Sequence, residues 1–180
     1  MRTVIVIVAA AALAAACQLR PERPPVEIVD NLNIDRFMGD WYVIANIPTF
    51  PEKGAHNAVE SYRRLGEDKI GVTFSFNQDG FDGERETMTP TGFVSDESNA
   101  IWGMRFIWPL RADYRVLYVD DAYQTTIVGR QKRDYLWIMA RDPALPDAAL
   151  ERLIDIAAER GYDVSRIQRV PQRWPEETGS

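Results

Sequence analysis

Short runs of aromatic and β-branched residues recur along the chain from residue 41 onward, with starting points roughly 10 to 17 residues apart. Polar segments that contain Gly, Asp, Asn or Gln separate the runs and are short enough for hairpins. The residue types favour strands over helices. The eight runs cover residues 41–47, 58–65, 69–76, 85–94, 100–107, 114–120, 125–130 and 135–140. This pattern predicts an antiparallel meander of eight strands.

One later segment has the periodicity of a helix. Its apolar positions follow the i, i+3, i+4, i+7 spacing and are Leu150, Leu153, Ile154 and Ala157. Pro146 suits a first helical turn, and Gly161 suits the residue that ends a helix. We therefore expect an α-helix that packs its apolar face on the outside of the sheet.

Sequential hairpins favour a closed up-and-down β-barrel over a sandwich, because no Greek-key crossing is needed. A barrel of eight strands has room for one small ligand. We expect the barrel and its helix to span residues 30–170, with a short ninth strand within 162–170. Residues 171–180 are polar and rich in proline, which predicts a disordered tail.

The first sixteen residues have the composition of a secretory signal peptide, with Arg2 followed by an uncharged apolar run. That run is shorter than the roughly 20 residues that span a bilayer. Cys17, the only cysteine, ends the motif "LAAAC", which resembles the lipobox of bacterial lipoproteins. The resemblance implies a lipidated Cys17, although Leu13 lies one position further from the cysteine than is usual. The alternative is ordinary cleavage that leaves a free thiol.

Residues near this cysteine bear on where the protein is located. Gln18, rather than Asp, follows the cysteine, which among lipoproteins implies the outer membrane of a Gram-negative envelope, on its periplasmic side. The acyl chains, palmitate among them, would hold the protein to the membrane. Residues 17–29 contain three prolines and predict an extended spacer between anchor and barrel.

Charge and residue counts argue against several classes of function. The net charge of −6 and the scattered basic residues argue against nucleic-acid binding. The chain has one histidine, His56, and no His/Cys cluster at ligand spacing, so we expect no metal site. A catalytic triad would depend on that single histidine. We therefore predict a binding protein without catalytic residues or a cofactor.

Three motifs carry a resemblance to a known family. "GDWYVIA" at 39–45 resembles the G-x-W signature of the lipocalins, and "DDAYQTTIV" at 120–128 resembles their second motif. "YLWIMARDP" at 135–143 resembles the third, which ends in an arginine. Their order, with strands around them and a helix after them, is that of the bacterial lipocalins related to apolipoprotein D. The resemblance implies that Trp41 closes the narrow end of the barrel and that Arg141 lies across its ring. It also implies a lysophospholipid or fatty acid as ligand.

Strand alternation then selects the residues that would line the cavity. With Trp41 inward, Val43, Ala45 and Ile47 also point inward. On the other strands the candidates are Tyr62, Phe74, Phe76, Trp102, Met104, Phe106, Tyr114, Val116, Tyr118, Trp137 and Met139. A slip of one residue would reverse any of these assignments, and core packing explains each aromatic residue equally well.

Charged residues qualify the lipid hypothesis. Arg105, Arg111 and Arg115 are candidates to bind a headgroup phosphate or carboxylate at the open end, the alternative being that they are solvated. Glu60 shares its parity with Tyr62 and would face the cavity, where a carboxylate is costly unless it is paired. It would pair with an arginine, lie near the mouth or reject anionic ligands.

A second hypothesis is an envelope scaffold with a fully packed barrel and no small-molecule ligand. The apolar loops 47–51 and 106–110 would then contact a protein or a membrane. A lipid-modifying enzyme is a further and weaker alternative. The sequence is compatible with either a monomer or a homodimer.

Overall fold

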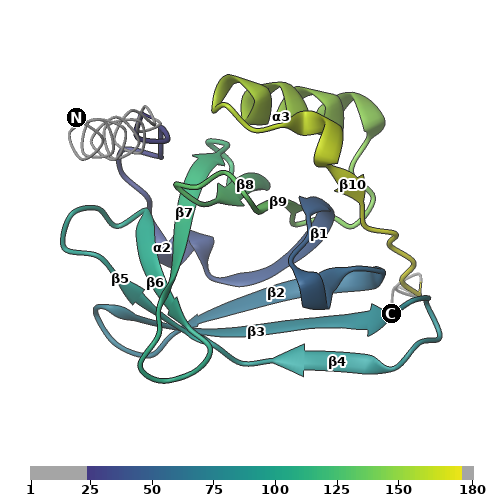
Figure 1. Cartoon of the computed structure of the whole chain (residues 1–180), viewed down its shortest axis with the longest axis horizontal. Helices are drawn as coiled ribbons and strands as arrows, with labels where there is room; N and C mark the ends of the chain where they lie inside the picture. The colour runs from purple at the N-terminus through teal and green to yellow at the C-terminus, as the bar shows by residue number, and fades with distance from the viewer. Residues whose placement is uncertain (1–23, 176–180) are drawn as a thin grey trace, which may run out of the picture.

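Nine strands, joined mostly by hairpin connections, form a closed antiparallel barrel (Figure 1). The computed structural model describes residues 24–175. The strands are β1 Gly39–Ile47, β2 Ala55–Arg64, β3 Lys69–Gln78, β4 Arg85–Met88, β5 Thr91–Val94, β6 Ile101–Arg105, β7 Ala112–Val119, β8 Thr125–Gly129 and β9 Leu136–Ala140. Pairing of β1 with β9 closes the sheet. The prediction of an eight-stranded up-and-down barrel is confirmed, because β4 and β5 together take one position.

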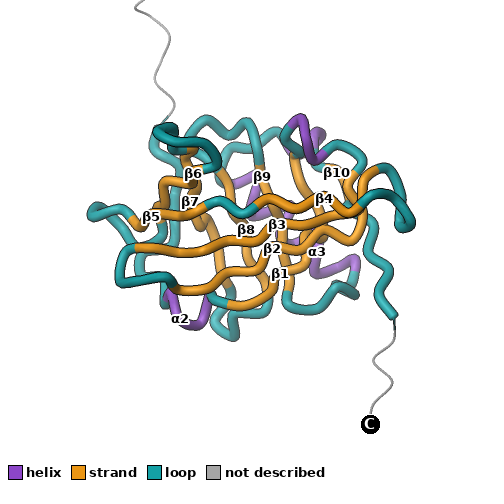
Figure 2. Tube along the Cα trace, turned by 90° about the horizontal axis from the view of Figure 1, so that it is seen from below, coloured by secondary structure: helices purple, strands orange, loops and turns teal. Residues whose placement is uncertain are grey.

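The run predicted as one strand over 85–94 is divided by Pro90. Proline has no N–H to donate to a ladder, so the strand is interrupted there. Both halves pair with β3, since Met88 lies opposite Phe74 and Gly92 lies opposite Ile70. Figure 2 shows β4, β3, β2 and β1 side by side on one wall of the barrel.

Helix α3 (Asp147–Glu159) lies outside the barrel, near β8 and β9 in Figure 1. Its buried residues are Leu150, Leu153 and Ala157, as the periodicity predicts. Pro146 is the N-cap rather than part of the first turn. After the helix, Gly161 takes a φ of +81° and its N–H donates to the carbonyl of Ala158 (2.8 Å), which satisfies one of the last free helix carbonyls.

Register shifts in the β1–β9, β2–β3 and β7–β8 ladders change which residues face the interior, and those in β1 and β7 affect predicted cavity residues. In the β1–β9 ladder the register shifts between Val43 and Ala45, which adds Ile44 as an extra residue. Trp41 and Val43 therefore belong to the interior cluster, as predicted. Ala45 and Ile47 were predicted to point inward, but they belong to the outer cluster that includes residues of α3. The prediction was wrong there because a bulge reverses the alternation of every later side chain.

A register shift also reverses the alternation of side chains in β7. Its register with β8 shifts between Val116 and Tyr118. Val116 lies in the interior cluster, whereas Tyr118 packs against the outer one. Tyr118 is therefore not a cavity residue, which corrects the prediction made from alternation.

The N-terminal segment is bound to the barrel from its first described residue. Val26 is buried, and its N–H donates to the side chain of Gln131 (3.0 Å). The N–H of Val29 donates to the carbonyl of Val116 (3.0 Å). Within the predicted spacer 17–29, residues 24–29 are thus part of the packed domain. The predicted signal peptide 1–16 and the predicted lipidation site Cys17 lie outside the described residues.

The C-terminal segment is also packed. The predicted ninth strand is reduced to β10 (Gln168–Arg169), which pairs with β1 after the short helix η2 (Val164–Arg166). Beyond it, the side-chain amide of Gln172 donates to the carbonyls of Val43 (2.7 Å) and Ala58 (3.3 Å). These bonds link β1 to β2 beside the bulge. The prediction of disorder from residue 171 is therefore wrong for 171–175, and residues 176–180 lie outside the described part.

Within residues 24–175, no helix is long and apolar enough to cross a membrane.

Helix α2 (Ile34–Phe37) closes one end of the barrel. Trp41 is fully buried beneath it, and its indole N–H donates to the carbonyl of Phe37 (2.8 Å). The guanidinium carbon of Arg141 lies 3.8 Å from the centre of the Trp41 ring. This stack is worth about 0.5 to 2 kcal/mol, depending on how far the cation is desolvated.

Arg141 also donates hydrogen bonds to several backbone carbonyl groups of this turn. Its Nη1 donates to the carbonyl of Asp40 (2.6 Å), and its Nη2 lies within hydrogen-bonding distance of three others. Those three carbonyls belong to Arg36 (2.9 Å), Phe37 (3.2 Å) and Met38 (2.7 Å). One side chain thereby joins the end of β9 to α2 and to the start of β1.

We predict that Arg141→Ala lowers the free energy of unfolding by about 1 to 3 kcal/mol, because it removes the stack and the hydrogen bonds to these carbonyls. Arg141→Lys keeps the charge but loses the planar guanidinium group. Its free energy of unfolding should lie between those of the wild type and Arg141→Ala. Urea unfolding measures the effect. Loss of ligand binding at an unchanged melting temperature would contradict this structural role.

Candidate functional site

A cavity of about 350 Å³ occupies the barrel at the end opposite α2. Residues from the connections after β1, β6 and β8 surround its mouth. The lining consists of Thr49, Pro51, Glu52, Glu60, Val72, Phe74, Met88, Pro90, Met104, Phe106, Ala112, Asp113, Tyr114, Arg130, Tyr135 and Trp137. Most of these side chains are apolar, and the polar groups are few.

The predicted cavity residues fall into three groups. Those that line the cavity are Phe74, Met104, Phe106, Tyr114 and Trp137. Those that are buried in the interior cluster without lining the cavity are Tyr62, Phe76, Trp102, Val116 and Met139. Tyr118 lies outside the barrel. Phe106 is 56 % exposed and therefore lies at the mouth rather than inside.

Packed aromatic rings form the floor of the cavity. The hydroxyl oxygens of Tyr62 and Tyr114 are 2.5 Å apart, and Trp102 stacks on Tyr114 with ring centres 5.2 Å apart. The ring of Phe37 packs edge-on against that of Trp102, with ring centres 5.7 Å apart. Of these four residues only Tyr114 reaches the cavity. The closed half of the barrel is therefore a packed core, and the open half holds the cavity.

Glu52 is a buried carboxylate that sequence reasoning missed. It is 6 % exposed and lies in the short helix η1 (Phe50–Glu52). It accepts hydrogen bonds from the hydroxyl of Thr49 (2.7 Å), the indole N–H of Trp137 (2.9 Å) and the amide of Asn46 (3.3 Å). Burial raises the pKa of Glu52, and these hydrogen bonds oppose the rise. Residues 49–52 match the T-x-x-E capping pattern, which is the signal that could have identified it.

Glu60 faces the cavity from β2, as its parity with Tyr62 predicts. It is 7 % exposed, and its Oε2 atom has no hydrogen-bond partner among the described residues. Burial, reinforced by the charge of Glu52, raises the pKa of Glu60 to about 8. The carboxyl group is therefore mostly protonated at pH 7. Of the alternatives considered, pairing with an arginine does not occur within residues 24–175.

The three arginines proposed for a headgroup do not line the cavity. The guanidinium carbons of Arg105 and Arg111 lie 4.6 and 3.9 Å from the centre of the Phe93 ring. Arg115 forms an ion pair with Asp113 (2.9 Å). Arg105 and Arg115 directly follow the inward-facing Met104 and Tyr114, so alternation turns them outward.

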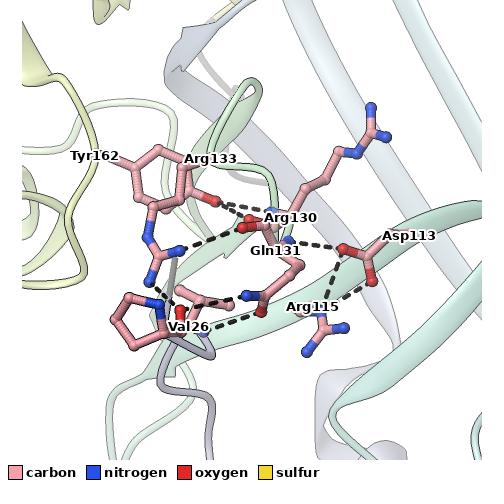
Figure 3. Close-up of polar contacts among 8 residues, drawn as sticks. Val26, Asp113, Arg115, Arg130, Gln131, Arg133 and Tyr162 are labelled. Carbon is pink, nitrogen blue, oxygen red and sulfur yellow. Dashed lines mark hydrogen bonds and ion pairs between the residues drawn. The ribbon is translucent and has the colours of Figure 1, made fainter. Parts of the chain in front are cut away.

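Arg130 is the basic residue of the described lining, and a hydrogen-bond network fixes its backbone (Figure 3). Its N–H donates to the hydroxyl of Tyr162 (2.7 Å), which in turn donates to the Arg130 carbonyl (2.9 Å). Gly129 is required there, because a Cβ atom would lie 2.1 Å from the Tyr162 hydroxyl. The next N–H, that of Gln131, donates to Asp113 (2.7 Å). The turn after β8 therefore holds Arg130 in a defined place at the mouth.

Among the residues that the structure describes, no group of His, Cys, Asp and Glu side chains is placed to hold a metal ion. His56 is not part of the lining, and its Nδ1 atom lies 2.9 Å from the carbonyl of Gly54.

Comparison with known proteins gives a consistent result. Residues 32–172 match the family model described as a lipocalin-like domain. The chain is 31 % identical to temperature-induced lipocalin-1 of Arabidopsis thaliana, over 84 % of this chain and 85 % of that protein. It is 30 % identical to the outer membrane lipoprotein Blc of Citrobacter freundii, over 94 % and 96 %. Among solved structures, insecticyanin from Manduca sexta superposes with a TM-score of 0.64 at 18 % identity, over 85 % and 86 % of the chains.

We predict that Glu60→Gln increases stability at high pH. The native state holds a proton that the unfolded chain loses above pH 4.5, so this group lowers the free energy of unfolding as pH rises from 4.5 to 8. The variant should match the wild type at pH 4.5 and be more stable at pH 9, by on the order of a few kcal/mol.

Thermal unfolding at several pH values measures this difference. Glu86→Gln, on the exposed strand β4, is the matched control and should show no comparable gain. If the melting temperatures of Glu60→Gln and the wild type change with pH in the same way, the pKa of Glu60 in the folded protein is not raised.

Proposed function

The chain belongs to the lipocalin family, and we propose that it binds a small single-chain lipid, a lysophospholipid or fatty acid, in its barrel cavity for storage or transport. The observation that carries this proposal is the cavity of about 350 Å³ with apolar walls above the aromatic floor. Membership of the lipocalin family supports the binding of a small hydrophobic ligand in general. Burial of twelve methylene groups would contribute on the order of 10 kcal/mol before the costs of association, which is sufficient for micromolar binding.

The charges of the cavity favour one orientation for such a lipid. Glu60 is on the inner wall, and the buried Glu52 is near enough to act on it electrostatically, so an anionic end would stay at the mouth. Arg130 is there to meet a phosphate or carboxylate, with Tyr135 beside it. The acyl chain would then run inward along Phe74 and Met104.

Apolar side chains near the mouth support lipid exchange at a membrane surface. In the connection after β6, Ile107, Trp108 and Leu110 are each more than 70 % exposed, and Phe50 of η1 is 82 % exposed. Exposed apolar clusters of this kind are typical of contact sites.

We propose further that Cys17 is lipidated and holds the protein at the periplasmic side of the outer membrane. Support comes from the motif "LAAAC" and from the similarity to a bacterial protein named as an outer membrane lipoprotein.

A variant that fills the cavity tests the lipid site. Ala112→Trp should place an indole in the cavity and reduce copurified lipid at least about tenfold, while Ala122→Trp, on an exposed turn at the closed end, should leave it unchanged. Mass spectrometry of solvent extracts measures the lipid. Absence of lipid from the wild type, together with failure of lipids to quench its tryptophan fluorescence, would favour the packed scaffold.

Replacement of the cysteine tests the anchor. Cys17→Ser should move the protein from the membrane fraction to the soluble fraction, because no acyl chain can be attached. Immunoblots of the two fractions measure this. A Cys17→Ser protein that stays with the membranes contradicts the proposed anchor.

A further inference from the structure

The carboxyl group of Glu60 stands out in the cavity because it has an unused acceptor atom. Glu52 accepts from three side chains, and Asp113 is bound to Arg115 and to the N–H of Gln131. Glu60 Oε2 is buried and has no partner among the described residues. A buried acceptor without a donor is costly, and a ligand that supplies the donor removes that cost.

The charged and titratable groups that line the cavity with Glu60 are two carboxylates, two tyrosines and one arginine. The described lining contributes Glu52 from η1, Asp113 and Tyr114 from β7, Arg130 after β8 and Tyr135 before β9. The neighbours of Glu60 in the strand ladders are Trp41 and Phe74, which carry no charge. The Nη1 atom of Arg130 lies 3.5 Å from Oδ2 of Asp134, so the carboxylate already compensates part of the arginine's charge.

We propose that the inner part of the cavity binds a cationic nitrogen, so that the preferred ligand is a single-chain amine whose ammonium group meets Glu60. The alkyl chain extends toward the mouth along Val72, Phe74, Met88 and Met104. This proposal rests on the proposed function, since it assumes a single-chain apolar ligand in the same cavity. It gives an amine preference over the lysophospholipid or fatty acid, and it reverses the orientation of the chain.

The alternatives are less favourable at the inner wall. A carboxylate or phosphate placed there lies near the charge of Glu52 in a site of low polarity and would raise the pKa of Glu60 further. A fatty acid would have to keep its carboxylate at the mouth. An alcohol supplies a hydrogen-bond donor without a charge, so its affinity should lie between those of the amine and the acid.

Proton release should accompany amine binding. In the empty cavity the raised pKa of about 8 keeps Glu60 mostly protonated at pH 7. When an ammonium group binds, Glu60 becomes a carboxylate and its proton passes to the solvent, while the ammonium group keeps its own. Below pH 8, the affinity for the amine should therefore increase about tenfold for each unit by which the pH rises.

Isothermal titration of the delipidated full chain with dodecylamine, dodecanol and dodecanoate tests the proposal. At pH 8 dodecylamine should bind at least about tenfold more tightly than dodecanoate. At pH 7 it should release nearly one proton, measured in buffers of different ionisation enthalpy. Glu60→Gln should abolish both the preference and the proton release, whereas the matched variant Glu86→Gln should keep them.

The outcomes separate this inference from the proposed function. Equal or tighter binding of dodecanoate, or a preference for the amine that survives in Glu60→Gln, overturns the inference. Binding of all three ligands with similar affinity also overturns it and leaves the apolar cavity as a lipid site. Failure of all three to bind overturns the inference and the proposed function together.

Discussion

The carbonyl groups that converge at the closed end of the barrel need donors that the backbone there does not provide. Arg141 meets this need with one planar side chain, which also covers the ring of Trp41. Because that end is fixed, α2 can bring Phe37 into the interior, where it packs on Trp41 and Trp102. The aromatic floor is built on this layer, so the cavity begins where the rings stop. A partly buried polar contact thus supports the packed end of the barrel, and the cavity lies beyond it.

The cavity itself is maintained at a cost to the fold. Two carboxyl groups are buried in its wall, and one of them has no complete set of partners within the described residues. A packed apolar interior would avoid that cost, since buried acids are rarely favourable without compensation. Unfavourable groups tend to collect at functional sites, where a ligand provides the compensation. The two buried carboxyl groups therefore fit the proposed role of the cavity in ligand binding.

Much of the fold could be predicted from sequence, because it depends on local signals. Turn residues, strand composition, the periodicity of 150–157 and Gly161 each report on their own segment. The bulges in β1 and β7 could not be predicted, since nothing in the composition around Ile44 or Leu117 shows that a residue is extra. The error placed Ala45, Ile47 and Tyr118 on the wrong side. The site was predicted less well. Arg105 and Arg115 could have been set aside by the alternation that gave Met104 and Tyr114, while Arg130 depends on a contact with the distant Tyr162. The polar composition of 171–175 concealed the bonds of Gln172 to two strands.

The attachment of the N-terminal segment along the barrel has a consequence for reach. Only the stretch from Cys17 to Pro24 separates the proposed anchor from residues held by the domain, through bonds such as that from Arg133 to the carbonyl of Pro24 (3.2 Å). Seven Cα–Cα steps extend to at most about 25 Å. A domain on so short a tether would stay within a thin layer next to its own bilayer. It would therefore have to take lipid from that leaflet or receive it from a carrier that reaches the membrane.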